Sequence, residues 1–268
     1  MAKVAEILEF LDQRAPMRTA LSFDNVGLLV GDPAARVERV LVALDITTPV
    51  VEEARAWGAE LIVAHHPVIF DALKRVVAGD PAAERVIALV RGGISAICMH
   101  TNLDAAQGGV NDALAAALHV QRETWLDPIA DGAGIGWVGA LSAPMPFAQF
   151  LEHTARALQV SGLRYQQSGA QVRRVAVGGG SCGSMLAQAA ALGCDTFVTA
   201  DVKHSQWLDA AEYRINLIDA GHFATENVVV APLAKQLAQA FPALCVRVSQ
   251  EQRDPVSYFT TEEAHHGA

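Results

Sequence analysis

An internal repeat constrains the fold of this chain more than any other feature of its sequence. With 135 added to each residue number, VERVLVALDIT (37–47) aligns with VRRVAVGGGSC (172–182), and WGAELIVAHH (57–66) aligns with LGCDTFVTAD (192–201). A later pair, ISAICMHTNLD (94–104) and NLIDAGHFATE (216–226), aligns with an offset of 122. Because the register is kept through several consecutive segments, the chain is predicted to contain two copies of one structural unit.

Each copy has the pattern of alternating strands and helices. Residues 37–45 are an apolar run rich in β-branched side chains, 48–58 are typical of a helix that ends at Gly58, and 59–66 are the next apolar run. Short, continuously apolar strands separated by helices indicate a largely parallel sheet covered on both faces. The predicted fold class is α/β, with a duplicated unit at 1–127 and 128–227 and with residues 228–268 packing against the first copy.

Composition and charge limit the classes of partner. The chain has 268 residues and a formal net charge of -9, so it offers no basic surface for nucleic acid, and binding of nucleic acid is not expected. The longest uncharged stretch, 175–194, contains three consecutive glycines and is not expected to span a membrane. The four cysteines lack C-x-x-C spacing, and no export signal is visible, so reduced thiols in a cytoplasmic protein are expected.

Histidines and carboxylates follow three of the predicted strands. His65 and His66 end the run LIVAHH, and both halves end a later strand with H-x-x-x-(D/E), once in HTNLD (100–104) and once in HFATE (222–226). Adjacent histidines at a strand end are also common at a polar loop edge, and one H-x-x-x-D arises easily by chance. Two such motifs at equivalent positions of a repeat, beside a histidine pair, favour a metal site.

The donor set predicts more than one ion. It consists of four imidazoles and two carboxylates, from His65, His66, His100, Asp104, His222 and Glu226. A single catalytic zinc keeps about three protein ligands and an open position, so these donors suit two divalent ions. Imidazole and carboxylate ligands fit Zn, Fe, Mn, Ni or Co, and the sequence does not choose among these metals.

Several motifs together resemble one known family. They are SFDNVGLLVGD (22–32), LIVAHHPVIF (61–70), MHTNLDAAQGGVNDALA (99–115), VAVGGGSCGS (175–184), TADVKH (199–204) and DAGHFATENV (219–228). In these motifs the chain is similar to the NIF-three-like family, also called the GTP cyclohydrolase I type 2 or dinuclear metal-centre family. The resemblance implies a duplicated α/β fold with mixed sheets, a dinuclear site between the halves, and a ring-shaped homohexamer.

The same resemblance assigns roles to individual residues. It places metal ligands at His65, His66, Asp104, His222 and Glu226, with His100 adjoining them and Glu226 as the bridge between two ions. This chain departs from the family in the stretch GIGWVGAL (134–141), where the resemblance leads us to expect an arginine in place of Trp137. It also lacks the large insertion of some relatives and is similar to the short bacterial form.

Four further residues are candidates for contacts with the substrate. Ser181 and Gly183 lie in a glycine-rich segment after a strand, which is either a phosphate-binding turn or a tight strand-to-helix connection. Asp24 and Asn25 lie in SFDNVG and either line the pocket or form a tight loop.

Three residues are candidates for proton transfer or for orienting the ligands. Asp201 and His204 follow the strand that is equivalent to the one ending at His66. A simple helix cap is the alternative role for Asp201. His100 is the third candidate, in addition to its place in the donor set.

These observations predict a metal-dependent hydrolase acting on a small-molecule substrate. The family resemblance implies GTP cyclohydrolase-like opening of a purine nucleotide ring, with His204 or His100 moving protons. Hydrolysis of a phosphoester suits a dinuclear site equally well. A metal-binding regulatory or interaction protein without catalytic activity is the alternative of a different class.

Overall fold

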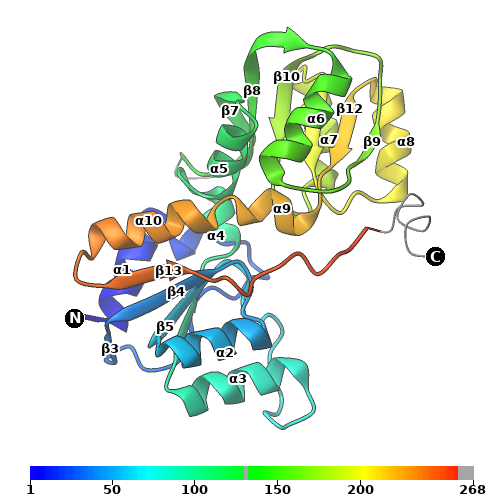
Figure 1. Cartoon of the computed structure of the whole chain (residues 1–268). Helices are drawn as coiled ribbons and strands as arrows, with labels where there is room; N and C mark the ends of the chain where they lie inside the picture. The colour runs from blue at the N-terminus through cyan, green and yellow to red at the C-terminus, as the bar shows by residue number, and fades with distance from the viewer. Residues whose placement is uncertain (130–131, 259–268) are drawn as a thin grey trace, which may run out of the picture.

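Two α/β lobes make up the protein, each built around one sheet (Figure 1). The computed structural model describes residues 1–129 and 132–258. The sheet of the first lobe has the strand order β13-β4-β5-β6-β2, in which only β2 runs antiparallel to its neighbour. Its strands are β2 (Gly27–Val30), β4 (Arg39–Ala43), β5 (Leu61–Ala64), β6 (Ser95–Cys98) and β13 (Cys245–Val248). A short ladder of β1 (Ala2–Lys3) and β3 (Arg36–Val37) lies beside it.

The central strands of this sheet are mostly apolar because helices cover both faces. Val40 and Val42 of β4 share one core with α1 (Val4–Arg14) and α10 (Val230–Ala240). Leu41 and Ala43, which alternate with them, share another core with α2 (Thr48–Trp57) and α3 (Pro81–Gly92). Burial on both faces of the sheet therefore explains the continuous apolar runs of the sequence, as predicted.

The second lobe contains the equivalent strands and an additional hairpin. Its sheet has the order β7-β8-β10-β11-β12-β9, and β10, β11 and β12 are parallel. The strands are β7 (Gln121–Pro128), β8 (Gly134–Met145), β9 (Arg164–Gln166), β10 (Val172–Val177), β11 (Thr196–Thr199) and β12 (Asn216–Asp219). The helices of this lobe are α6 (Phe147–Leu158), α7 (Leu186–Ala191) and α8 (His204–Tyr213). Both bounds of β5 and β11 differ by 135, and the predicted class, a mixed α/β fold, is confirmed.

The two lobes exchange helices where they meet. After β6 of the first lobe, α4 (Thr101–Ala105) leads to α5 (Val110–Ala117), whose Leu114 packs in the core of the second lobe. After β12 of the second lobe, α9 (His222–Asn227) leads to α10, whose Leu237 packs in the core of the first lobe. The exchange places the ends of β6 and β12 beside each other. The predicted boundary between the two copies at residue 127 stays a prediction. In the structure, β7, which spans this position, pairs in the second sheet, and β13 pairs in the first.

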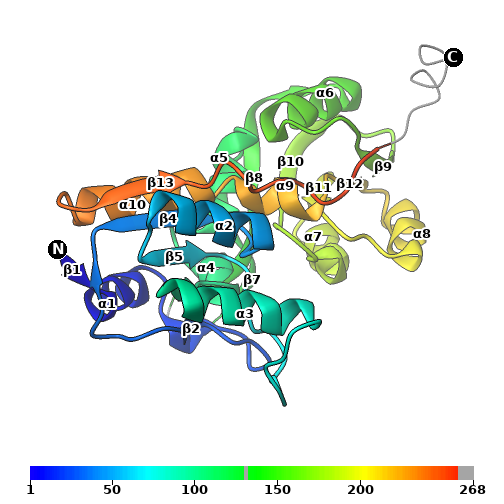
Figure 2. The ribbon, with the colours of Figure 1, turned by 60° about the horizontal axis from the view of Figure 1, so that its bottom comes forward.

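The segment after β13 returns from the first lobe to the second, passing close to α9 (Figure 2). Polar contacts attach it to the first lobe. Gln252 Oε1 accepts a hydrogen bond from the Leu44 amide at 2.8 Å, and Glu53 accepts one from the Gln250 amide at 3.0 Å. Among the helices that the structure describes, none has the length and apolarity needed to cross a membrane.

Candidate metal centre

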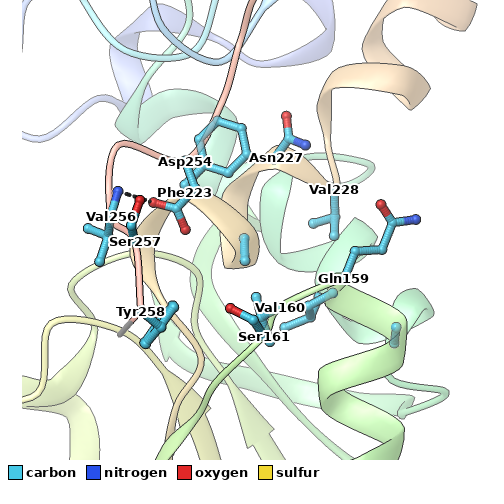
Figure 3. Close-up of a pocket in the computed structure, with 13 residues that line it drawn as sticks. Gln159, Val160, Ser161, Phe223, Asn227, Val228, Asp254, Val256, Ser257 and Tyr258 are labelled. Carbon is cyan, nitrogen blue, oxygen red and sulfur yellow. Dashed lines mark hydrogen bonds between the residues drawn. The ribbon is translucent and has the colours of Figure 1, made fainter. Parts of the chain in front are cut away.

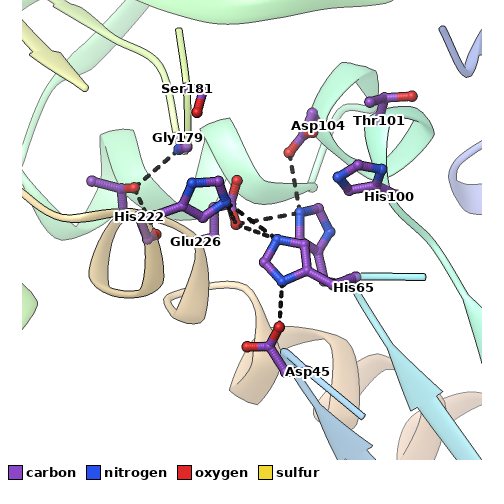
Figure 4. A network of polar contacts seen from close by, with 12 residues as sticks. Asp45, His65, His100, Thr101, Asp104, Gly179, Ser181, His222 and Glu226 are labelled. Atoms are coloured by element: carbon purple, nitrogen blue, oxygen red, sulfur yellow. Dashed lines mark hydrogen bonds and ion pairs between the residues drawn. The ribbon is translucent and has the colours of Figure 1, made fainter. Parts of the chain in front are cut away.

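Strand ends from both lobes bring all six predicted metal ligands together (Figure 4). His65 and His66 follow β5, and His100 precedes α4, which carries Asp104. His222 begins α9, and Glu226 lies one helical turn later on the same helix. Three combinations of these residues have ligand atoms within 4.8 Å of one another, namely His65–His66–His100, His66–His222–Glu226 and His65–Asp104–Glu226.

One oxygen of Glu226 lies at the centre of this cluster. Its Oε2 is 2.9 Å from His66 Nε2, 3.0 Å from His222 Nε2 and 3.7 Å from His65 Nε2. The same Nε2 atom of His65 is also 3.7 Å from Asp104 Oδ1. Glu226 is thus shared by two groups of donors, which is the position that a bridging carboxylate needs.

Buried polar atoms without partners show that the cluster fits a cation. His65 Nε2 and Asp104 Oδ1 are buried and have no hydrogen-bond partner among the described residues, and the buried Glu226 Oε2 lies against imidazole nitrogens that would themselves bind a metal. Leaving such a group unsatisfied costs about 1–3 kcal/mol each, and more for a charged one. A divalent cation bound by these atoms would satisfy all three, so the residues present fit a metal ion.

The other ring nitrogen of each histidine is held by an oxygen. This second contact fixes the orientation of the ring and leaves Nε2 free to bind a metal, as is usual for histidine ligands. The four Nδ1 contacts are His65 to the Met99 carbonyl at 2.8 Å, His66 to Asp45 at 2.7 Å, His100 to Asp24 at 2.8 Å and His222 to Asp201 at 2.7 Å.

The ionisation of the cluster reflects the closeness of its imidazoles to Glu226. Burial opposes a charge on His66, but its hydrogen bonds with Asp45 and Glu226 outweigh burial and raise its pKa to about 10. The hydrogen bond with Glu226 raises the pKa of His222 to about 9, although burial opposes this. Burial also opposes the charge of Glu226, but the charge of His65 and the hydrogen bonds from the imidazoles hold the pKa of this carboxyl well below its usual range. A metal would therefore replace protons on the imidazoles.

Two members of the cluster have pKa shifts that burial dominates. Burial lowers the pKa of His100, although Asp24 opposes this, so the ring is held in its neutral form. Burial raises the pKa of Asp104, although the charge of His65 opposes this. A second positive charge beside Asp104 would favour its ionised form.

Glycines after β10 make room for Glu226. A Cβ atom on Gly180, which has a φ of +63°, would overlap Glu226 Oε1, and one on Gly179 would lie 3.4 Å from Glu226 Cγ. The Gly179 amide donates to Asn111 Oδ1 at 2.9 Å, and the Gly180 amide donates to Thr225 Oγ1 at 3.0 Å. Since these two amides are engaged within the protein, they are not available to a phosphate.

The structure gives Asp24 and Asp201 supporting positions beside the cluster. Asp24 also accepts hydrogen bonds from the amide and the hydroxyl of Thr101, and these bonds and the one from His100 hold its pKa below the usual value despite burial. Asp201 accepts a hydrogen bond from the Ser181 hydroxyl in addition to the one from His222. Both carboxylates therefore orient histidines of the cluster.

The remaining candidates lie farther from the cluster. Asn25 donates from Nδ2 to the Ile69 carbonyl at 2.6 Å, which links its loop to the segment that follows the histidine pair. Gly183 faces Gln206 of α8, whose Oε1 would lie 2.5 Å from an added Cβ atom. His204 is exposed at the start of α8 and belongs to none of the three donor combinations. Substrate contact by Ser181, Gly183, Asp24 or Asn25 and proton transfer by His204, His100 or Asp201 stay predictions.

Two supporting groups were missed from the sequence, Asp45 and the Met99 carbonyl. Asp45 follows β4, the parallel neighbour of β5, and the pairing of Ala43 with Ala64 brings it beside His66. The sequence did contain a signal for Asp45. This carboxylate stands at the carboxyl end of a predicted strand, and the next predicted strand ends in the histidine pair. A backbone carbonyl leaves no signal in a sequence.

Trp137 lies in the β7–β8 hairpin, where an arginine was expected. Its ring stacks on Trp125 with a centroid distance of 3.7 Å, and the guanidinium of Arg122 lies 5.1 Å from its centroid. The indole is 9% exposed and belongs to the core of the second lobe. The substitution therefore places an apolar stacking pair at this position.

Fold and site together define a class: a duplicated α/β protein whose lobes enclose a histidine–carboxylate cluster able to hold a metal ion. The chain belongs to the Duf34/NIF3 (NGG1p interacting factor 3) family, which it matches over residues 2–255. This finding confirms the resemblance seen in the sequence motifs.

Relatives and solved structures of this family match nearly the whole chain. A Clostridium perfringens protein named GTP cyclohydrolase 1 type 2 homolog is 31% identical over 260 residues, which cover 96% of this chain and 99% of the relative. A protein of the same name from Streptomyces coelicolor is 37% identical and covers 84% and 82% of the two chains. A hypothetical protein of Staphylococcus aureus has a TM-score of 0.90 at 30% identity, over 96% of this chain and 99% of its own. A Bacillus cereus protein related to NIF3 has a TM-score of 0.90 at 25% identity, with the same coverage.

Proposed function

We propose that this protein is a hydrolase that depends on two divalent metal ions. The observation that carries the proposal is the position of the buried Glu226 carboxylate between two groups of donors. His66 and His222 would hold one ion and His65 and Asp104 the other, with Glu226 shared between them. His100, which lies beside the histidine pair, would complete the site.

Two divalent ions at such a site lower the pKa of water towards neutrality and polarise the group under attack. The protein's own residues position that chemistry. Asp24, Asp45 and Asp201 hold three of the imidazoles in place through Nδ1. A cavity of about 220 Å³, lined in part by Asp45, His66, Asp201 and His222, gives access to the cluster from one side.

Two reactions suit this arrangement. The names of the relatives support the opening of a purine nucleotide ring, as in a GTP cyclohydrolase. Hydrolysis of a phosphoester would use the same pair of ions. A role in regulation or interaction without turnover is the alternative, in which the metals would serve assembly or ion handling.

The deciding experiment combines metal content with turnover. Protein reconstituted with Zn, Fe, Mn, Ni or Co would be assayed on GTP and on a panel of phosphoesters, before and after chelation. We expect turnover that chelation abolishes and one ion restores. Reconstituted protein that binds two metals and turns over none of these substrates would refute the hydrolase.

Variants of the histidine pair test the assignment of the ions. We expect His65→Ala and His66→Ala each to lose one metal per chain before the other, as measured by plasma mass spectrometry. His119→Ala, which alters an exposed histidine outside the cluster, serves as the matched control. Loss of both ions together in each variant would contradict the separate assignment.

A further inference from the structure

The segment after β13 forms one wall of the cavity that opens on His66 and His222. The side chains of these two histidines are 22% and 38% exposed, more than those of the other four predicted ligands. Four residues of the segment line the cavity, namely Asp254, Pro255, Val256 and Tyr258. The segment therefore covers part of the side on which the predicted ligands lie closest to solvent.

The first half of the segment is attached to the first lobe by hydrogen bonds. Glu53 of α2 accepts bonds from the amides of Gln250 and Glu251, at 3.0 Å and 3.3 Å. Gln252 accepts one from the Leu44 amide at 2.8 Å. These contacts fix the chain as far as residue 252, so any movement of the segment would turn about this point.

Beyond Gln252 the segment is held in a different way. In the part of the chain that the structure describes, residues 253–258 make no hydrogen bond with either lobe. Within this stretch the Val256 amide donates to Asp254 at 2.9 Å (Figure 3). Val256 is 60% exposed. A stretch with few buried contacts and no hydrogen bonds to its surroundings opens locally at a small cost in free energy.

The ring of Tyr258 makes the contact that holds this stretch against the second lobe. It lies over Gly162, where an added Cβ atom would be 3.1 Å from the ring. Its hydroxyl is 3.8 Å from the corresponding position on Gly221, the residue before His222. The φ of Gly162 is outside the left-handed region, so what this glycine provides is room for the ring. The contact is therefore one of shape, and a methyl group at residue 162 would disturb it.

The same stretch separates two cavities. The cavity at the histidines has a volume of about 220 Å³, below the range of about 300–1,000 Å³ that is usual for small-molecule sites. A larger one of about 570 Å³ lies beside α9 (Figure 3). Asp254, Val256 and Tyr258 line both. Movement of the stretch would join the two cavities and enlarge the approach to the predicted ligands.

We propose that residues 253–258 form a lid over the metal centre, which turns about Gln252 and is held closed by the contact of Tyr258 with Gly162. This inference concerns access to the proposed metal site and rests on that part of the proposed function. The closed lid separates one side of the cluster from solvent, and the open lid admits metal ions and substrate. Lids of this kind keep water from a reacting site and complete it only when the substrate has entered.

Rates of metal exchange test the lid on the full chain loaded with zinc. Gly162→Ala displaces the Tyr258 ring, and Tyr258→Ala removes it. We expect a chromophoric chelator to extract zinc about tenfold faster from both variants, which corresponds to about 1.4 kcal/mol of lost contact. Loading of zinc should become faster by the same factor, so that the dissociation constant is unchanged, because the lid alters the path to the ligands and not the ligands themselves.

Two further variants serve as controls. Tyr258→Phe keeps the ring and should exchange zinc at the parent rate. Gly92→Ala, at the end of α3 and outside both cavities, places a Cβ atom 3.1 Å from Ile94 and should also leave the rates unchanged. Circular dichroism and metal counts equal to those of the parent show that each variant folds and binds zinc.

The outcomes distinguish the lid from the hydrolase. Parent rates in both Gly162→Ala and Tyr258→Ala would overturn the lid. Faster extraction together with a weaker affinity at equilibrium would also overturn it, because that result reports damage to the ligands. Faster exchange in both directions without turnover on any substrate would sustain the lid and refute the hydrolase. Turnover with unchanged exchange rates would refute the lid and leave the hydrolase standing.

Discussion

Replacing Asp45 by alanine is expected to weaken metal binding at the position of His66 without unfolding the protein. Asp45 Oδ1 lies 2.7 Å from His66 Nδ1 and holds the ring so that Nε2 faces Glu226. The side chain of Asp45 is 38% exposed and that of His66 is 22% exposed. Removal of Asp45 therefore opens no cavity in the core, and the effect falls on the orientation and basicity of the ring.

The size of the effect follows from this contact. Loss of a partner that orients a histidine ligand costs about 10–100-fold in metal affinity, or about 1.4–2.8 kcal/mol. Because Asp45 is partly exposed, water replaces part of the lost contact, and we expect a value near the lower limit, about tenfold. Asp45→Asn keeps an oxygen that accepts the Nδ1 hydrogen but removes the charge, so its loss should be smaller than that of alanine.

Competition with a chromophoric chelator measures the affinity of each position, and mass spectrometry counts the ions retained. Circular dichroism confirms that the variants fold, and Asp209→Ala serves as the control for loss of an exposed carboxylate. We expect affinity to fall in the order aspartate, asparagine, alanine, for one ion only. If Asp45→Ala binds both ions as tightly as the parent, the ring is not oriented by this hydrogen bond and the reasoning is wrong.

Three further predictions concern the rest of the cluster. Metal affinity should rise from pH 6 to pH 9 by up to about tenfold per pH unit for each proton displaced. The pKa of His66 is raised to about 10 and that of His222 to about 9, so protons compete with the metal throughout this range. Calorimetric titration of the metal at several pH values checks this, and an affinity that does not change with pH contradicts it. Glu226→Gln should lower the affinity for both ions at once, and loss of only one ion in the metal count would exclude a shared carboxylate. Gly180→Ala should lower the melting temperature and the metal content, because the added Cβ atom overlaps Glu226. Gly193→Ala is the control for the backbone cost alone, since Gly193 has a similar positive φ and open space around it. Equal effects of the two substitutions would exclude the overlap.

The repeat made the strands and the main helices predictable because each copy buries its strands on both faces. β5 and β11 have the same bounds once the offset is applied, and both are fully buried. The packing of α5 in the second lobe was not predictable in the same way. This helix has an apolar face, but the lobe against which that face packs depends on the path of the chain at the junction, which local patterns do not contain.

The metal ligands were easier to predict than the groups that hold them. His100 and His222 were predicted as ligands because the same H-x-x-x-(D/E) motif follows equivalent strands, and such a repetition is improbable by chance. Asp45 lacked such a signal, since a single carboxylate at a strand end is common. Its role depends on the register between β4 and β5, which only the structure supplies.

Comparison of equivalent positions explains why the two halves diverged at the site. His66 of the first half corresponds to Asp201 of the second, and Asp201 accepts the Nδ1 hydrogen of His222 just as Asp45 accepts that of His66. The position equivalent to Asp45 is Gly180, where any side chain would overlap Glu226. A fully symmetric site would therefore exclude its own central carboxylate. The second half has Ala200 and Asp201 in place of the ligands His65 and His66, and a glycine in place of Asp45. The space at Gly180 accommodates Glu226, and the hydrogen bond to Asp201 holds His222, so that both groups of donors can reach them.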